Sequence, residues 1–363
     1  MLKGDKVVMS SSLELIGRSA EFQRIVEILA LDGDLLIVGV PGSGRRTLVR
    51  GAAQAVKAIV LEVDCIRATD GERFLQLLVE AINQSFDVLE ISAALDTARE
   101  FFAFHVDESG IKLKLMRSLN QKQLWKAFEI LIELPQQLVT NSQQQAILIL
   151  HSFPHIRSWD RHNLWEATLR REIKQQNRVS YILIATIAET TNQTDYPLEI
   201  VQLAPLANEV LALWTRDIFQ TQGLTFDFRS QALQIFINAV QGHIGDAMTL
   251  IRRLQVLRRV DGIITEEEVE QAINGVLKDL SMTFESLLML LPANQVHVLE
   301  CLAIDPTEKP QSREYIQKHG LSRGGSLQGA LTGLQHKGLI YGAEQNYKLA
   351  LPLLVLWLRQ RLS

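Results

Sequence analysis

The chain reads Gly39-Val40-Pro41-Gly42-Ser43-Gly44-Arg45-Arg46-Thr47 directly after an uninterrupted apolar run over residues 35–38. The apolar run predicts a buried strand, and the residues after Gly44 fit the first turn of a helix. A glycine-rich turn at this place can surround phosphate oxygens with backbone N–H groups, and the helix N-terminus adds partial positive charge. The stretch therefore predicts a phosphate-binding loop in an α/β fold.

The side chains of this loop depart from the pattern G-x-x-x-x-G-K-[ST] at two positions. Arg45 stands where Lys is expected, and Arg46 stands where Ser or Thr is expected. Arg45 can still pair with phosphate oxygens, but Arg46 offers no oxygen to Mg²⁺. Thr47 is rotated by about 100° on the helix and would replace the missing hydroxyl only in a bulged loop. We therefore expect nucleotide binding with weakened Mg²⁺ affinity and assign no metal ligand.

The second half of such a site is expected at the end of another buried strand. Residues 146–150 form a continuous aliphatic run, which is typical of a buried parallel strand. His151 and Ser152 follow it, where a metal-supporting Asp and a water-activating Glu are expected. His151 could act as a replacement ligand or base, but we favour a polar residue satisfied by neighbouring backbone. The loss of both carboxylates indicates binding without ordinary hydrolysis, so no catalytic residue is assigned.

With these motifs, the chain resembles the AAA+/STAND division of P-loop ATPases, most closely the archaeal ATPase family, which is related to the origin-recognition ATPases. Ile16-Gly17-Arg18 is similar to part of the family's opening sequence, which lies near the adenine. Residues 181–186 resemble the strand that ends in a polar sensor residue, here Thr186. Residues 201–206 and 242–246 resemble the start of the helical lid and of its sensor helix. The resemblance implies an ATP or ADP site formed by the loop together with residues 16–18.

Departures from the family pattern limit the function further. Ring-forming members carry an arginine finger after the sensor strand, whereas residues 187–200 contain neither Lys nor Arg. The origin-recognition lid helix reads Gly-Asp-x-Arg, whereas here Met248 stands at the arginine position. Arg252 and Arg253 follow one turn later and could face the phosphates. These departures argue against a ring ATPase and leave oligomerisation open.

Composition predicts a globular chain of two or three domains, with 363 residues, 47% apolar and 21% charged. The formal net charge of −4 does not favour general binding to nucleic acid or anionic membranes. Cys65 and Cys301 lack CxxC spacing, which indicates free thiols in a reducing compartment. No signal peptide is apparent, and the apolar runs are shorter than the ~20 residues that span a bilayer. We therefore expect a cytoplasmic protein with no membrane partner.

Three domains are predicted, over residues 1–205, 206–280 and 281–363. Strand candidates at residues 35–38, 59–63, 146–150, 181–185 and 200–203 alternate with helices, which predicts a parallel sheet with helices on both faces. Residues 70–145 are predicted to be mostly helical. The second domain reads as a helical lid. In the third, helices near residues 295–303, 312–319 and 326–337 precede two short strands, which predicts a winged helix-turn-helix, and residues 351–358 are predicted to form a buried helix.

A winged helix-turn-helix raises a DNA hypothesis, in which residues 326–337 enter the major groove. The candidate contacts are Arg313, Lys318, Arg323, Gln328 and Lys337. Residues 282–363 contain eight basic and six acidic residues, a formal charge of +2. Because phosphate neutralisation supplies much of DNA affinity, this small excess permits weak binding without requiring it. In STAND relatives the winged domain instead packs on the nucleotide domain as part of a switch.

Three functions follow from these residues. The first is a nucleotide-binding switch or scaffold, a pseudo-ATPase whose nucleotide biases the packing of lid and winged domain and whose state is read by an unidentified protein partner. The second is a slow ATPase activated by a partner or by an unconventional carboxylate, for which Asp64 is the nearest candidate. The third is a DNA-binding regulator that keeps the loop as a scaffold. We favour the first.

Overall fold

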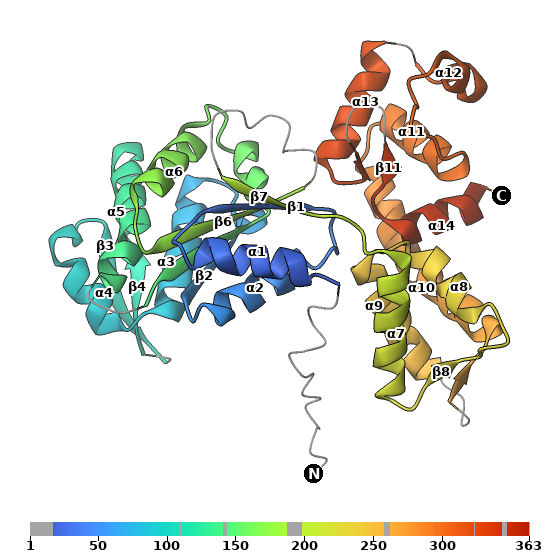
Figure 1. Ribbon diagram of the computed structural model, residues 1–363. Helices are drawn as coiled ribbons and strands as arrows, with labels where there is room; N and C mark the ends of the chain where they lie inside the picture. Colours follow the sequence, from blue (N-terminus) through green and yellow to red (C-terminus); the bar gives the residue numbers. More distant parts are fainter. Residues whose placement is uncertain are drawn as a thin grey trace.

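The structure is a computed structural model that describes residues 17–108, 110–140, 144–186, 198–257, 262–322, 324–342 and 347–362. Figure 1 shows an α/β half built from the first part of the chain and a helical half built from the rest. The two halves meet where β7 leads into α7 (Asn208–Gln220).

The α/β half contains a five-stranded parallel sheet in the order β2-β5-β6-β1-β7. These strands are β2 (Ile59–Asp64), β5 (Ala146–His151), β6 (Val179–Ala185), β1 (Leu35–Gly39) and β7 (Glu199–Leu203). The three inner strands are buried along their whole length, as expected where both faces of a parallel sheet are covered. The five predicted strands are confirmed.

Helices cover both faces of this sheet. Leu35 and Ile37 point to one face, into a hydrophobic cluster with α1 (Ser19–Leu29) and α2 (Arg45–Ala55). Leu36 and Val38 point to the other, into a cluster with α3 (Gly71–Ser85), α5 (Gln121–Val139) and α6 (Leu164–Gln175). The predicted three-layer fold is therefore confirmed.

The segment between residues 70 and 145 is not as helical as predicted. After α4 (Val88–Ala94) come the paired antiparallel strands β3 (Phe102–Asp107) and β4 (Gly110–Leu115). The prediction was wrong here because the apolar residues of β4, Ile111, Leu113 and Leu115, recur every second residue, which is the period of a strand. Short 3₁₀ turns lie at Cys65–Arg67, Asp96–Ala98 and Phe153–Ser158.

The lid consists of α7, α8 (Ala232–Val240), α9 (Ile244–Leu257) and α10 (Glu266–Met289). Two short parallel strands, β8 (Thr225–Phe226) and β9 (Ile263–Ile264), were not anticipated. Thr265 and Glu268 form a capping box at the start of α10. The predicted boundary at residue 280 falls inside α10, which continues into the last domain.

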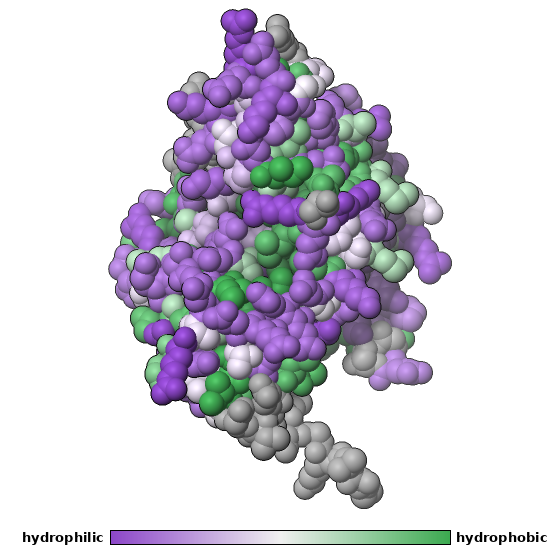
Figure 2. Space-filling view, turned by 90° about the vertical axis from the view of Figure 1, so that its right-hand side faces the viewer, coloured by the Kyte–Doolittle hydropathy of each residue, from purple (hydrophilic) through white to green (hydrophobic). Residues whose placement is uncertain are grey.

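The last domain contains α11 (Ala293–Ile304), α12 (Arg313–His319), α13 (Gly325–His336), the antiparallel pair β10 (Ile340–Tyr341) and β11 (Lys348–Leu349), and α14 (Pro352–Leu362). One hydrophobic cluster runs from Leu206 to Leu358, so lid and winged domain share a core. Figure 2 shows their outer face, where hydrophobic residues gather in the middle of a mainly hydrophilic surface. None of the helices in the described residues is long and apolar enough to cross a membrane.

Candidate nucleotide-binding site

The predicted loop connects the end of β1 to the start of α2. Gly42 and Gly44 have φ angles of 79° and 87°, in the left-handed region that favours glycine. A Cβ atom on Gly39 would lie 2.8 Å from Ser43 Oγ and 3.1 Å from the Leu203 carbonyl oxygen. No side chain of the described residues caps α2, so its first N–H groups are available to an anion.

Two hydroxyl groups beside the loop are buried without a partner. Ser43 is 3% exposed, and neither Ser43 Oγ nor Thr186 Oγ1 has a hydrogen-bond partner among the described residues. Thr186 follows β6 directly. Leaving a buried polar group unpaired costs about 1–3 kcal/mol, so these atoms suit a polar ligand. The loop and its surroundings therefore fit a phosphate group.

Arg45 is held at the end of the neighbouring strand. Its Nη1 donates to the carbonyl oxygen of Ala185, the last residue of β6, at 2.5 Å. Burial, together with the charge of Arg46, lowers the pKa of the Arg45 guanidinium. Because a guanidinium has five N–H donors, this bond leaves others free to meet a phosphate.

Arg46 reaches further across the sheet, toward the edge strand β2. Its Nη2 lies 3.2 Å from Asp64 Oδ2, in a half-exposed ion pair. Asp64 ends β2, where it is paired in register with His151 of β5. The metal-supporting Asp was expected at the end of β5, which lies next to β2. The structure therefore pairs Arg46 with a carboxylate at the neighbouring strand end.

His151 is satisfied by a side chain rather than by the expected backbone group. Its Nε2 lies 3.0 Å from Glu62 Oε2, and Arg50 binds the same carboxylate with two hydrogen bonds of 2.5 and 2.6 Å. Burial, together with the charge of Arg46, lowers the pKa of His151 below its usual value, although Glu62 and Asp64 raise it. Burial alone would raise the pKa of Glu62, but the bonds from Arg50 and His151 hold it below its usual value. His151 is therefore a neutral donor to Glu62.

Across the described residues, no group of three His, Cys, Asp or Glu side chains could hold a metal ion. Ser152, the other residue of the degenerate strand end, has a φ of 51° and precedes the 3₁₀ turn at Phe153–Ser158. Thr47 lies inside α2 and is exposed, so the loop is not bulged to bring its hydroxyl forward.

The residues assigned to the adenine end lie against the lid. Arg18 is 6% exposed; its Nη1 donates to Glu21 at 2.9 Å, and its Nη2 donates to the Ala204 carbonyl oxygen. Gly17 packs against Val210 of α7 so closely that a Cβ atom would collide with it. Ile16 lies outside the described residues. Arg18 thus ties α1 to the connection between the two halves.

The start of α9 makes direct contacts with the loop that the sequence did not assign. Gly245 N donates to the Gly42 carbonyl oxygen at 3.0 Å, and the imidazole of His243 donates to the Pro41 carbonyl oxygen. Arg253 instead forms a 3.0 Å ion pair with Asp279 of α10, so the expectation that it faces the phosphates is wrong. The sequence around His243 does not show whether this histidine contacts the phosphate loop or packs in the core of the lid.

The candidate DNA contacts are only partly available. Lys318 pairs with Asp305 at 2.7 Å, and the side-chain amide of Gln328 contacts Gln311. Arg313 and Lys337 are exposed. Arg323 lies outside the described residues. The exposed positions in the first turns of α13 are Gly325, Ser326, Gln328 and Gly329, which carry no charge.

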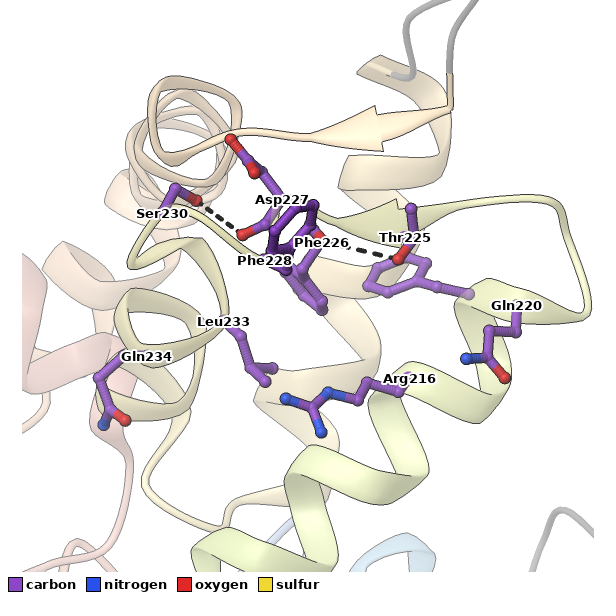
Figure 3. Close-up of a pocket in the computed structure, with 10 residues that line it drawn as sticks. Arg216, Gln220, Thr225, Phe226, Asp227, Phe228, Ser230, Leu233 and Gln234 are labelled. Atoms are coloured by element: carbon purple, nitrogen blue, oxygen red, sulfur yellow. Dashed lines mark hydrogen bonds between the residues drawn. The ribbon is translucent and has the colours of Figure 1, made fainter.

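A separate cavity of about 420 Å³ lies in the lid. Figure 3 shows Arg216 and Gln220 of α7 facing Leu233 and Gln234 of α8 below the rings of Phe226 and Phe228. Its lining residues all come from the lid, so this cavity is not part of the loop site.

Comparisons with known proteins match this geometry. A family described as a probable winged helix domain matches residues 282–360. A Walker-type ATPase of Pyrococcus abyssi aligns over 95% of this chain and 96% of that chain, with a TM-score of 0.66 and 15% identity. The chain has a Walker-type ATPase fold and a winged helix domain.

Two origin-recognition structures share the fold at a lower level. The ORC1 protein of Aeropyrum pernix in complex with DNA gives a TM-score of 0.50 and 15% identity, covering 95% of this chain and 93% of that chain. A chain of Drosophila ORC bound to DNA also gives 0.50 and 15%, covering 100% and 94%. No curated protein matches the sequence significantly. The predicted resemblance is thus confirmed at the level of fold.

Proposed function

We propose that this protein binds ATP or ADP at residues 39–47 and acts as a nucleotide switch with little or no hydrolysis. The observation that carries the proposal is the Arg46–Asp64 ion pair beside an intact glycine loop. The loop keeps the backbone that holds phosphate, while the two side chains nearest the metal position bind each other.

The ion pair makes metal-independent binding the expected behaviour. Mg²⁺, when bound to such a loop, neutralises phosphate charge and orients the terminal phosphates. Here Arg45 places a guanidinium group beside the loop, and guanidinium groups pair well with phosphate oxygens. The Asp64 carboxylate is held by Arg46 and so is not free to support a metal. Fixed positive charge from the protein thus replaces part of what Mg²⁺ would supply.

Among the described residues at this site, the candidate bases for hydrolysis are all engaged by other side chains. His151 donates to Glu62, and Glu62 is held by Arg50, so neither group is free to accept a proton from water. Asp64, the carboxylate that a slow ATPase would use, pairs with Arg46. A cytoplasmic protein partner that contacts the winged domain would then read which nucleotide is bound.

A calorimetric titration with ATP and with ADP tests this function. Arg45→Ala should weaken binding about tenfold or more, because hydrogen bonds to charged groups contribute about 1.5–3 kcal/mol each. Arg24→Ala is the matched control, since Arg24 forms an exposed 2.9 Å ion pair with Glu199 on another part of the sheet. Equal affinity in the two variants, or Mg²⁺-dependent turnover of ATP by the wild-type protein, would contradict the proposal.

A DNA-binding regulator is the second candidate, and the observation in its favour is the fold shared with an origin-recognition protein solved on DNA. If it is correct, Arg313→Ala with Lys337→Ala should weaken duplex binding and reduce its dependence on salt. Wild-type binding that is weak and equal to that of the double variant would favour the nucleotide switch.

A further inference from the structure

The lid donates hydrogen bonds to carbonyl groups of the phosphate loop. A carbonyl only accepts, so His243 Nε2–H is the donor to Pro41 O, at 2.5 Å. Gly245 N–H donates to Gly42 O at 3.0 Å. The His243 ring lies so close to Gly42 that a Cβ atom there would be 2.5 Å from His243 Cε1. Position 42 therefore admits only glycine while the lid is in place.

The bond to Pro41 O leaves the Gly42 N–H to a ligand, whereas the Ser43 N–H, in the next peptide group, donates to Val40 O at 3.2 Å. A phosphate is bound by loop N–H groups, and the Pro41 carbonyl shares its peptide group with the Gly42 N–H. A hydrogen bond accepted by the carbonyl polarises the peptide and makes its N–H a better donor. The lid contact thus fixes the loop in a shape that accepts phosphate and does not compete for the same atoms.

The same histidine is connected to the winged domain through one carboxylate. His243 Nδ1 lies 3.1 Å from Asp246 Oδ1, and Asp246 Oδ2 accepts from Leu353 N at 3.1 Å. Leu353 is the second residue of α14, so Asp246 caps that helix from the lid. Burial would lower the pKa of His243, but Asp246 and the Pro41 carbonyl together raise it above its usual value. The backbone N–H of Asp246 also lies 3.1 Å from Nδ1, which accepts from it when the ring is neutral.

A second contact joins the winged domain to the loop. Gly338 follows α13, and a Cβ atom there would lie 3.5 Å from Pro41 Cδ and 3.3 Å from Thr186 Cγ2. The winged domain therefore meets the loop and the end of β6 directly as well as through Asp246.

We propose that His243 and Asp246 form a clasp that couples phosphate binding at the loop to docking of the winged domain. This inference rests on the proposed function for its ligand. Because coupling between two sites is reciprocal, nucleotide tightens the docking of α14 by the same factor by which docking tightens nucleotide. His243 and Asp246 are positioning residues and need not touch the ligand.

Affinity for ADP in clasp variants tests the coupling. His243→Ala and Asp246→Ala should each bind ADP about tenfold more weakly, whereas His243→Gln should recover most of the affinity because an amide can donate to Pro41 O. The controls are His297→Ala, an exposed histidine of α11, and Asp217→Ala, an exposed aspartate of α7. Unchanged or tighter ADP binding by His243→Ala overturns the clasp.

Amide hydrogen exchange at the start of α14 gives a readout that a merely structural role would not move. At saturating ADP, exchange at Leu353 should slow in the wild-type protein and in both controls, and should not slow in His243→Ala, which keeps the Asp246 acceptor. Equal slowing in His243→Ala overturns the coupling. If the wild-type protein binds neither ADP nor pyrophosphate, the proposed function and the coupling are both wrong. If it binds ADP but exchange at Leu353 does not slow, only the coupling is wrong.

Discussion

At the scale of single residues, the loop shows how far side-chain identity can be interpreted without a structure. The sequence predicted that Arg46 removes a metal ligand, because an arginine carries no oxygen. It could not predict the Asp64 partner, because Asp64 lies on another strand and reaches Arg46 only through the order of strands in the sheet. The Glu62 contact of His151 was missed for the same reason.

The two arginines can be replaced by the residues that the ordinary pattern requires. Arg45→Lys combined with Arg46→Thr restores the loop hydroxyl and frees Asp64 to support a metal. We expect ATP binding by this double variant to weaken at least fivefold in EDTA, as measured by calorimetry. If EDTA leaves the ATP affinity of the double variant unchanged, as expected for the wild-type protein, Arg46 does not set the metal dependence of binding.

Asp34, which precedes β1, gives a stability prediction with a defined sign. Burial raises the pKa of its carboxyl from 3.8 to about 6, although Tyr181 N donates to it at 2.8 Å. The pKa of Asp34 is higher in the folded state than in the unfolded state. The contribution of this carboxyl group to folding stability is therefore intact below about pH 4 and is lost as pH rises through about 6. Asp34→Asn keeps the acceptor and does not titrate, so it should gain about 2–3 kcal/mol at pH 8 and little at pH 4. Urea unfolding at the two pH values measures this gain, and an equal effect at both would contradict it.

At the scale of elements, the strands of the central sheet could be predicted from their apolar sequence, whereas the β3–β4 hairpin was missed. The three inner strands contain long aliphatic runs, and the edge strands β2 and β7 contain shorter ones. The β3–β4 hairpin was missed although Ile111, Leu113 and Leu115 recur with the period of a strand. The sequence could not show that the side-chain amide of Asn83 in α3 bonds both the N–H and the carbonyl of Leu113, because that contact is long-range.

The connection between β5 and α6 depends on one buried carboxylate. Glu166 is 7% exposed and accepts hydrogen bonds from Arg157 at 2.6 and 2.8 Å and from Arg170 at 2.8 and 3.0 Å. Glu166→Ala leaves partly buried positive charge behind, so it should destabilise the fold by about 3 kcal/mol. Glu129→Ala, which loses only an i,i+3 pair with the exposed Lys126, should change stability by less than about 0.5 kcal/mol in the same chemical denaturation experiment. Similar losses in the two variants would contradict this account.

At the scale of the whole molecule, the lid and the winged domain behave as one body with a shared core. The sequence placed a boundary at residue 280, but Phe284 of α10 packs on Trp357 of α14, with ring centroids 5.6 Å apart. This body meets the α/β half at the phosphate loop through the contacts of His243, Gly245 and Gly338. Sequence patterns report each segment's own burial, and therefore cannot show which segments share a core.

Because the lid and the winged domain share a core, a substitution in that core should destabilise both domains. Phe284→Ala should destabilise lid and winged domain together by about 3–5 kcal/mol, since it removes a buried aromatic side chain. Hydrogen exchange should quicken in both α8 and α13, while the strands of the sheet stay protected. Faster exchange confined to α13 would mean that the two domains unfold separately.

The central claim is that the loop binds nucleotide without needing a metal, and the most direct measurement is equilibrium binding of a fluorescent ATP analogue in Mg²⁺ and in EDTA. The account predicts tight binding that is the same in both buffers, because Arg45 supplies positive charge at the loop and Arg46 holds Asp64, the carboxylate that would otherwise support a metal. Binding that requires Mg²⁺, or no binding in either buffer, would contradict it.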